Sequence, residues 1–315
     1  MDALSDVLHS VRLTGAVFFD IHAAEPWVAA TPPGRSIVSR IFPGTEHLIP
    51  YHVVMEGSCW VGIGGEAPIR LSGGDIIMFP HGHAHVLSSA PGARSKPDLA
   101  LYRRPSDRQL PFEISMGDVQ NVQAHVVCGY LGCDARPFNP LLAALPNVVR
   151  LSGQGSGALA AYVRAALAEA KAPRLGGESV LGRLSELMFV DVVRRYLEEL
   201  PAERRDWLAG LRDPAVGRAL NALHRMPSRS WTLAALAREV GVSRSVLAER
   251  FTQFVGRPPM QYLTNWRLQR AAHDLRSGSD SIAVIADRVG YESATAFSRA
   301  FKKALGVPPS AWRQR

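Results

Sequence analysis

The stretch 281–313 reads SIAVIADRVGYESATAFSRAFKKALGVPPSAWR, and its pattern decides the architecture of the last third of the chain. Two short amphipathic runs lie on either side of Gly290, and a Gly-x-Pro-Pro sequence follows the second run. Glycine readily adopts the left-handed conformation that ends a helix, whereas proline starts a helix but does not extend the previous one. With Asp280 or Ser281 as the first cap, the stretch predicts a helix-turn-helix unit followed by a third short helix.

A second copy of this pattern lies upstream. Residues 236–241 align with residues 285–290 at an offset of 49, and the offset becomes 50 past the turn. We expect Thr232 and Ser243 to cap the two helices of this copy and Gly241 to form its turn. The inward positions of its second helix are expected to be Val246, Leu247, Phe251 and Phe254. Such a duplication predicts two helix-turn-helix units in one chain.

The segment between the two units, residues 260–276, has apolar residues at helical spacings and is expected to form one helix. At 1.5 Å per residue this helix is about 25 Å long. Successive major grooves on one face of a duplex lie about 34 Å apart, so a rigid spacer of this size would let one chain read two sites.

The basic charge of the chain is concentrated in the same segment. Residues 1–214 hold 20 Lys+Arg against 22 Asp+Glu, a balance of −2, whereas residues 215–315 hold 16 against 6, a balance of +10. A basic excess confined to one part of a chain indicates a polyanionic partner for that part. Together with the repeat, it predicts binding to double-stranded DNA.

Residues 214–315 resemble the DNA-binding domain of the AraC/XylS family over its whole length, and 281–313 carry most of the resemblance. It implies that the second helix of each unit enters the major groove, and that RNA polymerase is a partner. The positions that would face bases are Ser245, Ala248, Glu249, Ala294, Thr295, Ser298 and Arg299.

The chemistry of these side chains differs between the two units. Arg299 suits a guanine edge, Glu249 accepts from cytosine N4, and Ala248 or Ala294 suits a thymine methyl group. Contacts to phosphate set affinity and register rather than sequence preference. We expect them from Ser243, Arg244, Arg250, Ser293, Lys302 and Lys303.

The first part of the chain has short apolar runs separated by Gly and Pro. This pattern is typical of an antiparallel barrel or jelly roll. Strands are predicted at 16–19, 36–38, 52–55, 60–63, 75–79 and 123–128. The stretch 74–85, GDIIMFPHGHAH, resembles the second cupin motif, and 54–57, VMEG, resembles the end of the first. The resemblance implies a cupin-like sensor domain for an unidentified effector.

Cupins often hold a metal through histidines from both motifs. His85 matches the ligand of the second motif, and His47 and His52 lie near the first, although its His-x-His pair and glutamate are absent. Three imidazoles would suit a divalent transition metal such as Zn, Ni, Fe or Mn. The alternative is that these histidines are ordinary polar residues.

Thiols offer a second sensing hypothesis. Cys59, Cys128 and Cys133 are too few for a disulfide framework in a chain of 315 residues. An accessible thiol with a lowered pKa would respond to oxidants, whereas a buried cysteine acts as a small apolar residue.

The sequence as a whole predicts a multidomain α+β protein. Residues 1–135 form the cupin-like β barrel, 136–213 a helical connector and 214–315 the all-α DNA-binding domain. The apolar helical stripe in 180–200 suits either core packing or dimerisation, so a homodimer is expected. No apolar run is long enough for a membrane span and no basic leader is evident, which predicts a cytoplasmic location.

The function expected from this organisation is transcription regulation in response to a small-molecule, metal or oxidant signal. Two alternatives come from other classes: a metal-dependent cupin enzyme fused to a DNA-binding tail, and an architectural DNA binder. An enzyme would need a complete ligand set and a general base.

Overall fold

The computed structural model describes residues 2–102, 110–118, 120–152, 158–172 and 174–314. The chain forms two compact units, each built from segments that are apart in the sequence. The sheet unit comprises Leu13–Cys133 and Leu145–Glu199, and the helical unit comprises Met1–Arg12, Asp134–Ala144 and Leu200–Arg315.

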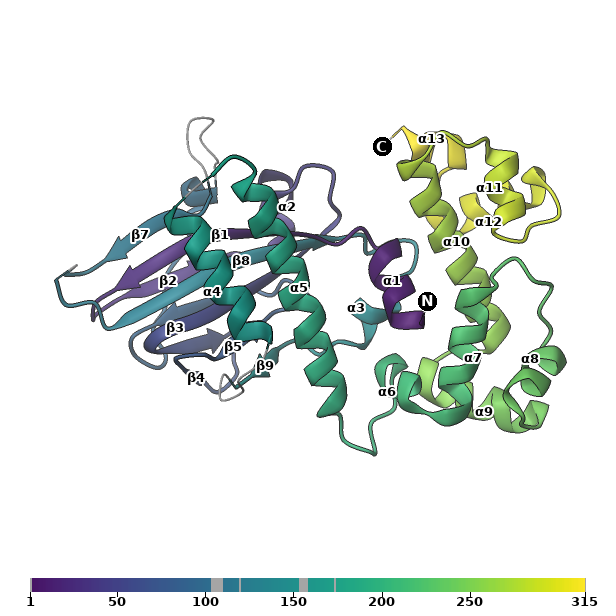
Figure 1. Cartoon of the computed structure of the whole chain (residues 1–315), viewed down its shortest axis with the longest axis horizontal. Helices are drawn as coiled ribbons and strands as arrows, with labels where there is room; N and C mark the ends of the chain where they lie inside the picture. Colours follow the sequence, from purple (N-terminus) through teal and green to yellow (C-terminus); the bar gives the residue numbers. More distant parts are fainter. Residues whose placement is uncertain (1, 103–109, 119, 153–157, 173, 315) are drawn as a thin grey trace. The chain divides into compact units, whose positions relative to one another are not determined.

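The expected fold class is confirmed, because a curled cupin-like sheet precedes an all-α part with two helix-turn-helix units (Figure 1). The predicted region 214–315 lies wholly in the helical unit. The predicted regions 1–135 and 136–213 each contribute segments to both units.

The described residues of the sheet unit contain one nine-stranded sheet. Its strands are β1 (Thr14–Ala23), β2 (Val28–Thr31), β3 (His47–Ile63), β4 (Ile69–Ser72), β5 (Ile76–Met78), β6 (His85–Ser88), β7 (Phe112–Met116), β8 (Ala124–Cys133) and β9 (Val149–Leu151). The order is β2-β6-β3-β8-β1-β7, with β4 and β5 paired to β3, and β9 paired to β5. All pairings are antiparallel except that of β1 with β7.

The long strand β3 curls the sheet. Its first part pairs with β8 and β5, and its last part pairs with β4 and β6. The predicted strands 52–55 and 60–63 are therefore parts of one continuous strand. Since one strand belongs to both parts of the sheet, the sheet closes around an apolar core.

Side chains of β1 and β8 alternate between the two faces of the sheet, as in any strand. Phe19 and Ile21 of β1, with Cys128 and Tyr130 of β8, belong to the buried core on the concave face. A register shift between Val17 and Phe19 interrupts the alternation in β1, so that the neighbours Phe18 and Phe19 both belong to the core.

The helices of the sheet unit are α2 (Gly34–Ile41), the 3-10 helix η1 (Leu99–Tyr102), α4 (Ala158–Lys171) and α5 (Gly177–Glu198). The predicted strand 36–38 is wrong, because these residues lie in α2. Ile37 and Ile41 lie four apart, as one face of a helix requires, and Ile37 is fully buried. Packing of this face against the core thus outweighs the strand preference of Ile-Val.

Helices α4 and α5 lie over the convex face of the sheet (Figure 1). A glycine in β1 allows this close packing, because a Cβ atom on Gly15 would lie 2.5 Å from the Cβ of Ser185 in α5. The hydroxyl groups of Tyr51 and Ser185 also share a hydrogen bond of 2.8 Å.

The helices of the helical unit are α1 (Ala3–Ser10), α3 (Pro140–Ala144), α6 (Trp207–Arg212), α7 (Pro214–Arg225), α8 (Leu233–Val240), α9 (Arg244–Val255), α10 (Pro259–Ser277), α11 (Ile282–Arg288), α12 (Ala294–Leu305) and α13 (Pro309–Arg313). The predicted spacer helix is confirmed in α10, whose 19 residues span about 28 Å.

Carboxylates from outside residues 214–315 complete the polar contacts of this unit. Asp6 of α1 accepts a hydrogen bond of 2.7 Å from Arg270, and its other oxygen lies 3.1 Å from Nδ1 of His224. Asp134 accepts hydrogen bonds from Arg12 and Arg276. The helical unit therefore includes α1 and the segment that begins at Asp134 as integral parts.

Candidate nucleic-acid interface and ligand cavity

The first helix-turn-helix unit consists of α8 and α9. Thr232 caps α8, since its Oγ1 accepts from the Ala235 N–H at 3.1 Å, and Ser243 caps α9 through the Val246 N–H at 3.3 Å. Gly241 ends α8 with φ of +72°, a conformation that costs other residues free energy. The expected caps and turn of this unit are confirmed.

The second unit consists of α11 and α12. Ser281 rather than Asp280 caps α11, with a distance of 3.2 Å from its Oγ to the Val284 nitrogen, and Ser293 caps α12. Gly290 has φ of +88°, and a Cβ atom there would lie 2.7 Å from the Cα of Ser228. Glycine is thus required at this turn for two reasons, backbone conformation and space.

Helices α9 and α12 each bury one face and expose the other. The inward side chains are Leu247, Phe251, Phe297 and Phe301, all with 0% exposure. The residues predicted to face bases lie on the other side: Ser245, Glu249, Thr295 and Arg299 are exposed, and Ala248, Ala294 and Ser298 are half-buried. This arrangement leaves the predicted base-facing set available to a partner.

The prediction that Val246 faces inward is wrong, because its side chain is 45% exposed on α9. Val246 adjoins Leu247 in sequence and so lies about 100° from it around the helix. An exposed valine on a recognition helix suits the methyl group of thymine. Counting helical positions from Leu247 and Phe251 would have identified it.

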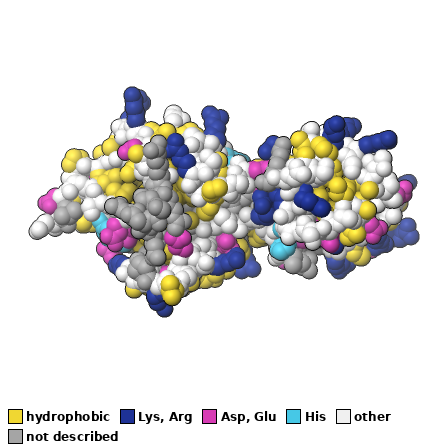
Figure 2. All heavy atoms as spheres, turned by 90° about the horizontal axis from the view of Figure 1, so that it is seen from above, with side chains coloured by type: hydrophobic (Ala, Val, Ile, Leu, Met, Phe, Trp, Pro, Cys, Tyr) yellow, Lys and Arg dark blue, Asp and Glu magenta, His cyan; other side chains and the backbone are white. Residues whose placement is uncertain are grey.

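The predicted phosphate contacts fall into two groups. Arg244, Lys302 and Lys303 are exposed and form no ion pair within the described part of the chain. Arg250 instead binds Asp213 through two nitrogens, at 2.6 and 2.8 Å from one carboxylate oxygen. Figure 2 shows Lys and Arg side chains at several places on the visible face of the helical unit.

Ser243 and Ser293, which were also predicted to contact phosphate, are the N-caps of α9 and α12. The N-terminus of a helix carries partial positive charge and free N–H groups, and it favours anions. A phosphate would therefore be stabilised at the N-termini of α9 and α12.

A cavity of about 160 Å³ lies within the curled sheet. Apolar side chains of several strands and residues near η1 line most of it. Its lining residues are Phe19, Ile21, Val28, Ala29, Ala30, Thr31, His52, Leu87, Ser95, Lys96, Asp98, Leu101, Tyr102, Ile114, Met116, Cys128 and Tyr130. A partly open, mainly apolar space with a few polar groups is typical of small-molecule sites.

Two buried histidines meet beside this cavity. The Nε2 atoms of His52 and His85 lie 2.6 Å apart, and Nδ1 of His85 lies 2.8 Å from the His83 carbonyl. A carbonyl only accepts, so Nδ1 of His85 carries the proton, and Nε2 of His52 must donate to Nε2 of His85. This assignment leaves Nδ1 of His52 as a bare acceptor, and that buried atom has no hydrogen-bond partner among the described residues.

Burial keeps both rings neutral. It lowers the pKa of His52 well below the ordinary range, with a further decrease from the neighbouring His85. Burial also lowers the pKa of His85 to about 4. Both imidazoles are therefore uncharged near neutral pH.

The structure does not bring His47 together with His52 and His85. His47 and His52 are five residues apart on β3, and an odd spacing places their side chains on opposite faces of the sheet. Nε2 of His47 lies 2.6 Å from the Pro80 carbonyl instead. The three histidines therefore do not fit one metal ion.

The three cysteines are buried, and none of them is in a disulfide bond. Burial raises the pKa of Cys59 to about 12 and the pKa of Cys128 well above its usual value. Since the thiolate is the reactive form, these environments favour unreactive thiols.

Comparison with known proteins extends over both units. Residues 2–198 match the family model described as Cupin, and residues 236–315 match the model described as Helix-turn-helix domain. The chain is 32% identical over 317 residues to an AraC-like transcription regulator of Streptomyces lividans, with coverage of 100% of this chain and 98% of that protein.

One further regulator and one solved structure are also similar to this chain. The HTH-type transcriptional regulator AlkR of Acinetobacter baylyi is 26% identical over 320 residues, and the match covers 100% of both chains. Among solved structures, the C-terminal domain of AraT, a response regulator from Geobacillus stearothermophilus, matches 32% of this chain and 85% of its own. The identity is 37% and the TM-score is 0.32. Within the described ranges, every helix is too short or too polar to span a lipid bilayer.

Proposed function

Because the chain belongs to the family of AraC-like transcription regulators with a cupin domain, we propose that it regulates transcription by binding promoter DNA through α9 and α12 in response to a small effector. One observation carries this proposal. Two capped helices of equal length, each buried on one face, expose polar side chains on the other within a segment of net charge +10.

The two helices are proposed to read different bases. At the offset of 50, Glu249 of α9 corresponds to Arg299 of α12, and Val246 corresponds to Ala296. A carboxylate accepts from cytosine, whereas a guanidinium donates to guanine. Opposite charges at equivalent positions therefore favour an asymmetric DNA site.

The cavity supports a small, mainly apolar effector. A cavity of 150 Å³ accommodates a molecule of about the size of benzene, and this cavity measures about 160 Å³. The bare Nδ1 of His52 would accept a hydrogen bond from a hydroxyl or amine of such a molecule. The effector class proposed is thus a compound of about one ring with one hydrogen-bond donor.

Regulation is proposed in preference to catalysis, because the matched relatives carry the names of transcription regulators. Of the signals considered from the sequence, a small molecule has support from the cavity. A metal at His47, His52 and His85, or an oxidant at the three thiols, does not have comparable support. A cytoplasmic location, a homodimer and contact with RNA polymerase complete the proposal.

DNA binding is tested by selection from random double-stranded oligonucleotides with the full-length chain, followed by footprinting of the enriched sequence. The expected result is one asymmetric site protected over two successive major grooves. Arg299→Ala should change the selected sequence, and the control Arg238→Ala, at an exposed position of α8, should not. Protection without any sequence preference would contradict the proposal.

The effector cavity is tested with phenol and toluene, which differ in the presence of a hydrogen-bond donor. Calorimetry should show tighter binding of phenol, and Ala30→Trp should abolish binding by filling the cavity. Ala67→Trp, in an exposed loop of the same unit, is the matched control. Equal binding of phenol to wild type and Ala30→Trp would rule out this cavity.

A further inference from the structure

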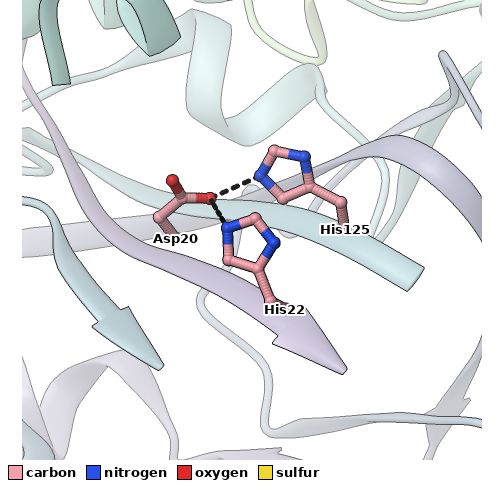
Figure 3. A group of neighbouring side chains, drawn as sticks. All are labelled: Asp20, His22 and His125. Atoms are coloured by element: carbon pink, nitrogen blue, oxygen red, sulfur yellow. Dashed lines mark hydrogen bonds and ion pairs between the residues drawn. The ribbon is translucent and has the colours of Figure 1, made fainter. Parts of the chain in front are cut away.

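Three ligand-type side chains meet on the sheet, on the face opposite to the cavity. The register pairs His22 of β1 with His125 of β8, and Asp20 lies two residues before His22 on the same face. Ile21, between them, points to the other face and lines the cavity. Figure 3 shows both imidazoles directed at the same oxygen of the Asp20 carboxylate.

The distances suit a metal ion. Nε2 of His125 lies 2.6 Å from Oδ1 of Asp20, and Nε2 of His22 lies 3.8 Å from the same oxygen. Ligand atoms in a tetrahedral zinc site with bonds of 2.0–2.1 Å are about 3.3 Å apart. The two distances bracket this value. Among the described residues, no other set of three His, Cys, Asp or Glu ligand atoms lies within 4.8 Å of one another.

The site is also held in place and open on one side. The side chains of Asp20 and His125 are 4% and 9% exposed, whereas that of His22 is 36% exposed. The two imidazole rings stack with centroids 4.3 Å apart and an angle of 14° between their planes. Burial and stacking fix the ligands, and the exposed side leaves room for an exchangeable water.

We propose that Asp20, His22 and His125 bind a divalent transition-metal ion. Two imidazoles and one carboxylate suit Zn²⁺, Co²⁺, Ni²⁺ and Fe²⁺, whereas Mg²⁺ and Ca²⁺ prefer sites made of oxygen ligands. The ion would replace the Asp20–His125 hydrogen bond by bonds that join β1 to β8. Binding should therefore stabilise the strand pair whose other face lines the cavity.

This site differs from the histidines of the cupin-like motifs. His52 lines the cavity and contacts His85, whereas His47 contacts the Pro80 carbonyl. A matched set of histidine variants consequently separates the two locations.

The experiment measures Zn²⁺ binding to the full chain by calorimetry after treatment with a chelator, with the absorption spectrum of added Co²⁺ as a second readout. Wild type should bind one equivalent. His22→Ala should lower the affinity about tenfold or more and abolish the Co²⁺ spectrum. His47→Ala, the control, should bind as wild type does.

Folding is checked separately, because Asp20 and His125 are buried. Without metal, His22→Ala should unfold at nearly the wild-type temperature, since this side chain is partly exposed. Zn²⁺ should raise the unfolding temperature of wild type and of His47→Ala by more than that of His22→Ala. No binding by wild type, or equal binding by His22→Ala, would overturn the proposal.

Discussion

Arg299 and Glu249 show how two copies of one structural unit acquire different chemistry. Both side chains are exposed, and both occupy the same position of their helix. Because Arg299 forms no ion pair in the described part of the chain, its guanidinium is available to a base edge. We therefore expect the base that each unit recognises to depend on single exposed side chains and not on the fold of the unit.

Replacement of Arg299 by alanine should weaken binding by about 1–3 kcal/mol, and only for DNA that carries guanine at one position. The measurement is the affinity for a set of oligonucleotides in which each base pair is changed in turn. Lys303→Ala serves as the control and should weaken binding to every oligonucleotide alike. A uniform loss with Arg299→Ala would identify Arg299 as a phosphate contact instead.

His224 should make the protein less stable in acid. Burial lowers its pKa from the ordinary value of 6.5, although the nearby Asp6 opposes this shift. The neutral ring is satisfied on both sides, since Nδ1 donates to Asp6 and Nε2 accepts from the Tyr262 hydroxyl at 2.7 Å. Below pH 6.5 the unfolded chain binds a proton that the folded chain does not, so stability decreases as the pH falls toward the folded-state pKa.

The expected slope for this one proton is at most about 1.4 kcal/mol per pH unit. Urea unfolding of wild type and His224→Gln between pH 7 and 5 measures it, and the variant should show a smaller slope. Other buried histidines contribute equally to both proteins and cancel in the difference. Identical slopes would mean that His224 takes up its proton equally in both states.

Among the elements, the two helix-turn-helix turns offer a matched pair of glycines. Within the described part of the chain, a Cβ atom on Gly241 would meet no atom within 4 Å, whereas one on Gly290 would clash with the backbone of Ser228. Gly241→Ala should therefore cost only the left-handed conformation, roughly 1–2 kcal/mol. Gly290→Ala should cost roughly another 1–3 kcal/mol for the clash.

The free energy of unfolding in urea compares the two variants, with wild type as the reference. Equal losses for both would show that the backbone near Ser228 moves without cost.

The sequence predicts the helical elements better than the strands. In 232–313, the capping residues, the glycines and the spacing of apolar residues all indicate the same fold. Every helix of the two helix-turn-helix units is therefore predicted correctly. The segment 36–38 has strand-forming residues but forms part of α2, because burial of Ile37 decides its conformation. The secondary-structure preference of a short segment is therefore a reliable guide only where tertiary packing favours the same structure.

The cluster of Asp20, His22 and His125 shows a second reason why a site can be missed in the sequence. Asp20 and His125 are 105 residues apart, and only the pairing of β1 with β8 brings them together. The cupin-like motifs direct attention to His47, His52 and His85 instead, and an odd spacing on β3 separates His47 from the other two. The pairing register of the strands decides which histidines meet, and this register cannot be read from the sequence alone.

For the whole molecule, the proposed homodimer involves α5. Val180 and Leu187 are 43% and 46% exposed on this helix, and a spacing of seven places them on one side. Leu187→Glu should shift the protein toward the monomer in analytical ultracentrifugation. Ala67→Glu, in an exposed loop of the same unit, is the control. A monomeric wild type, or an unchanged dimer in Leu187→Glu, would exclude this face of α5.

The contacts of Asp6 and Asp134 have a consequence for engineering. The polypeptide crosses between the two units at the bonds 12–13, 133–134, 144–145 and 199–200, so both segments of the sheet unit are insertions between segments of the helical unit. A truncation at residue 214 removes the carboxylates that contact Arg270, His224 and Arg276. Chimeric regulators should therefore exchange residues 13–133 and 145–199, and should retain residues 2–12 and 134–144 together with the rest of the helical unit.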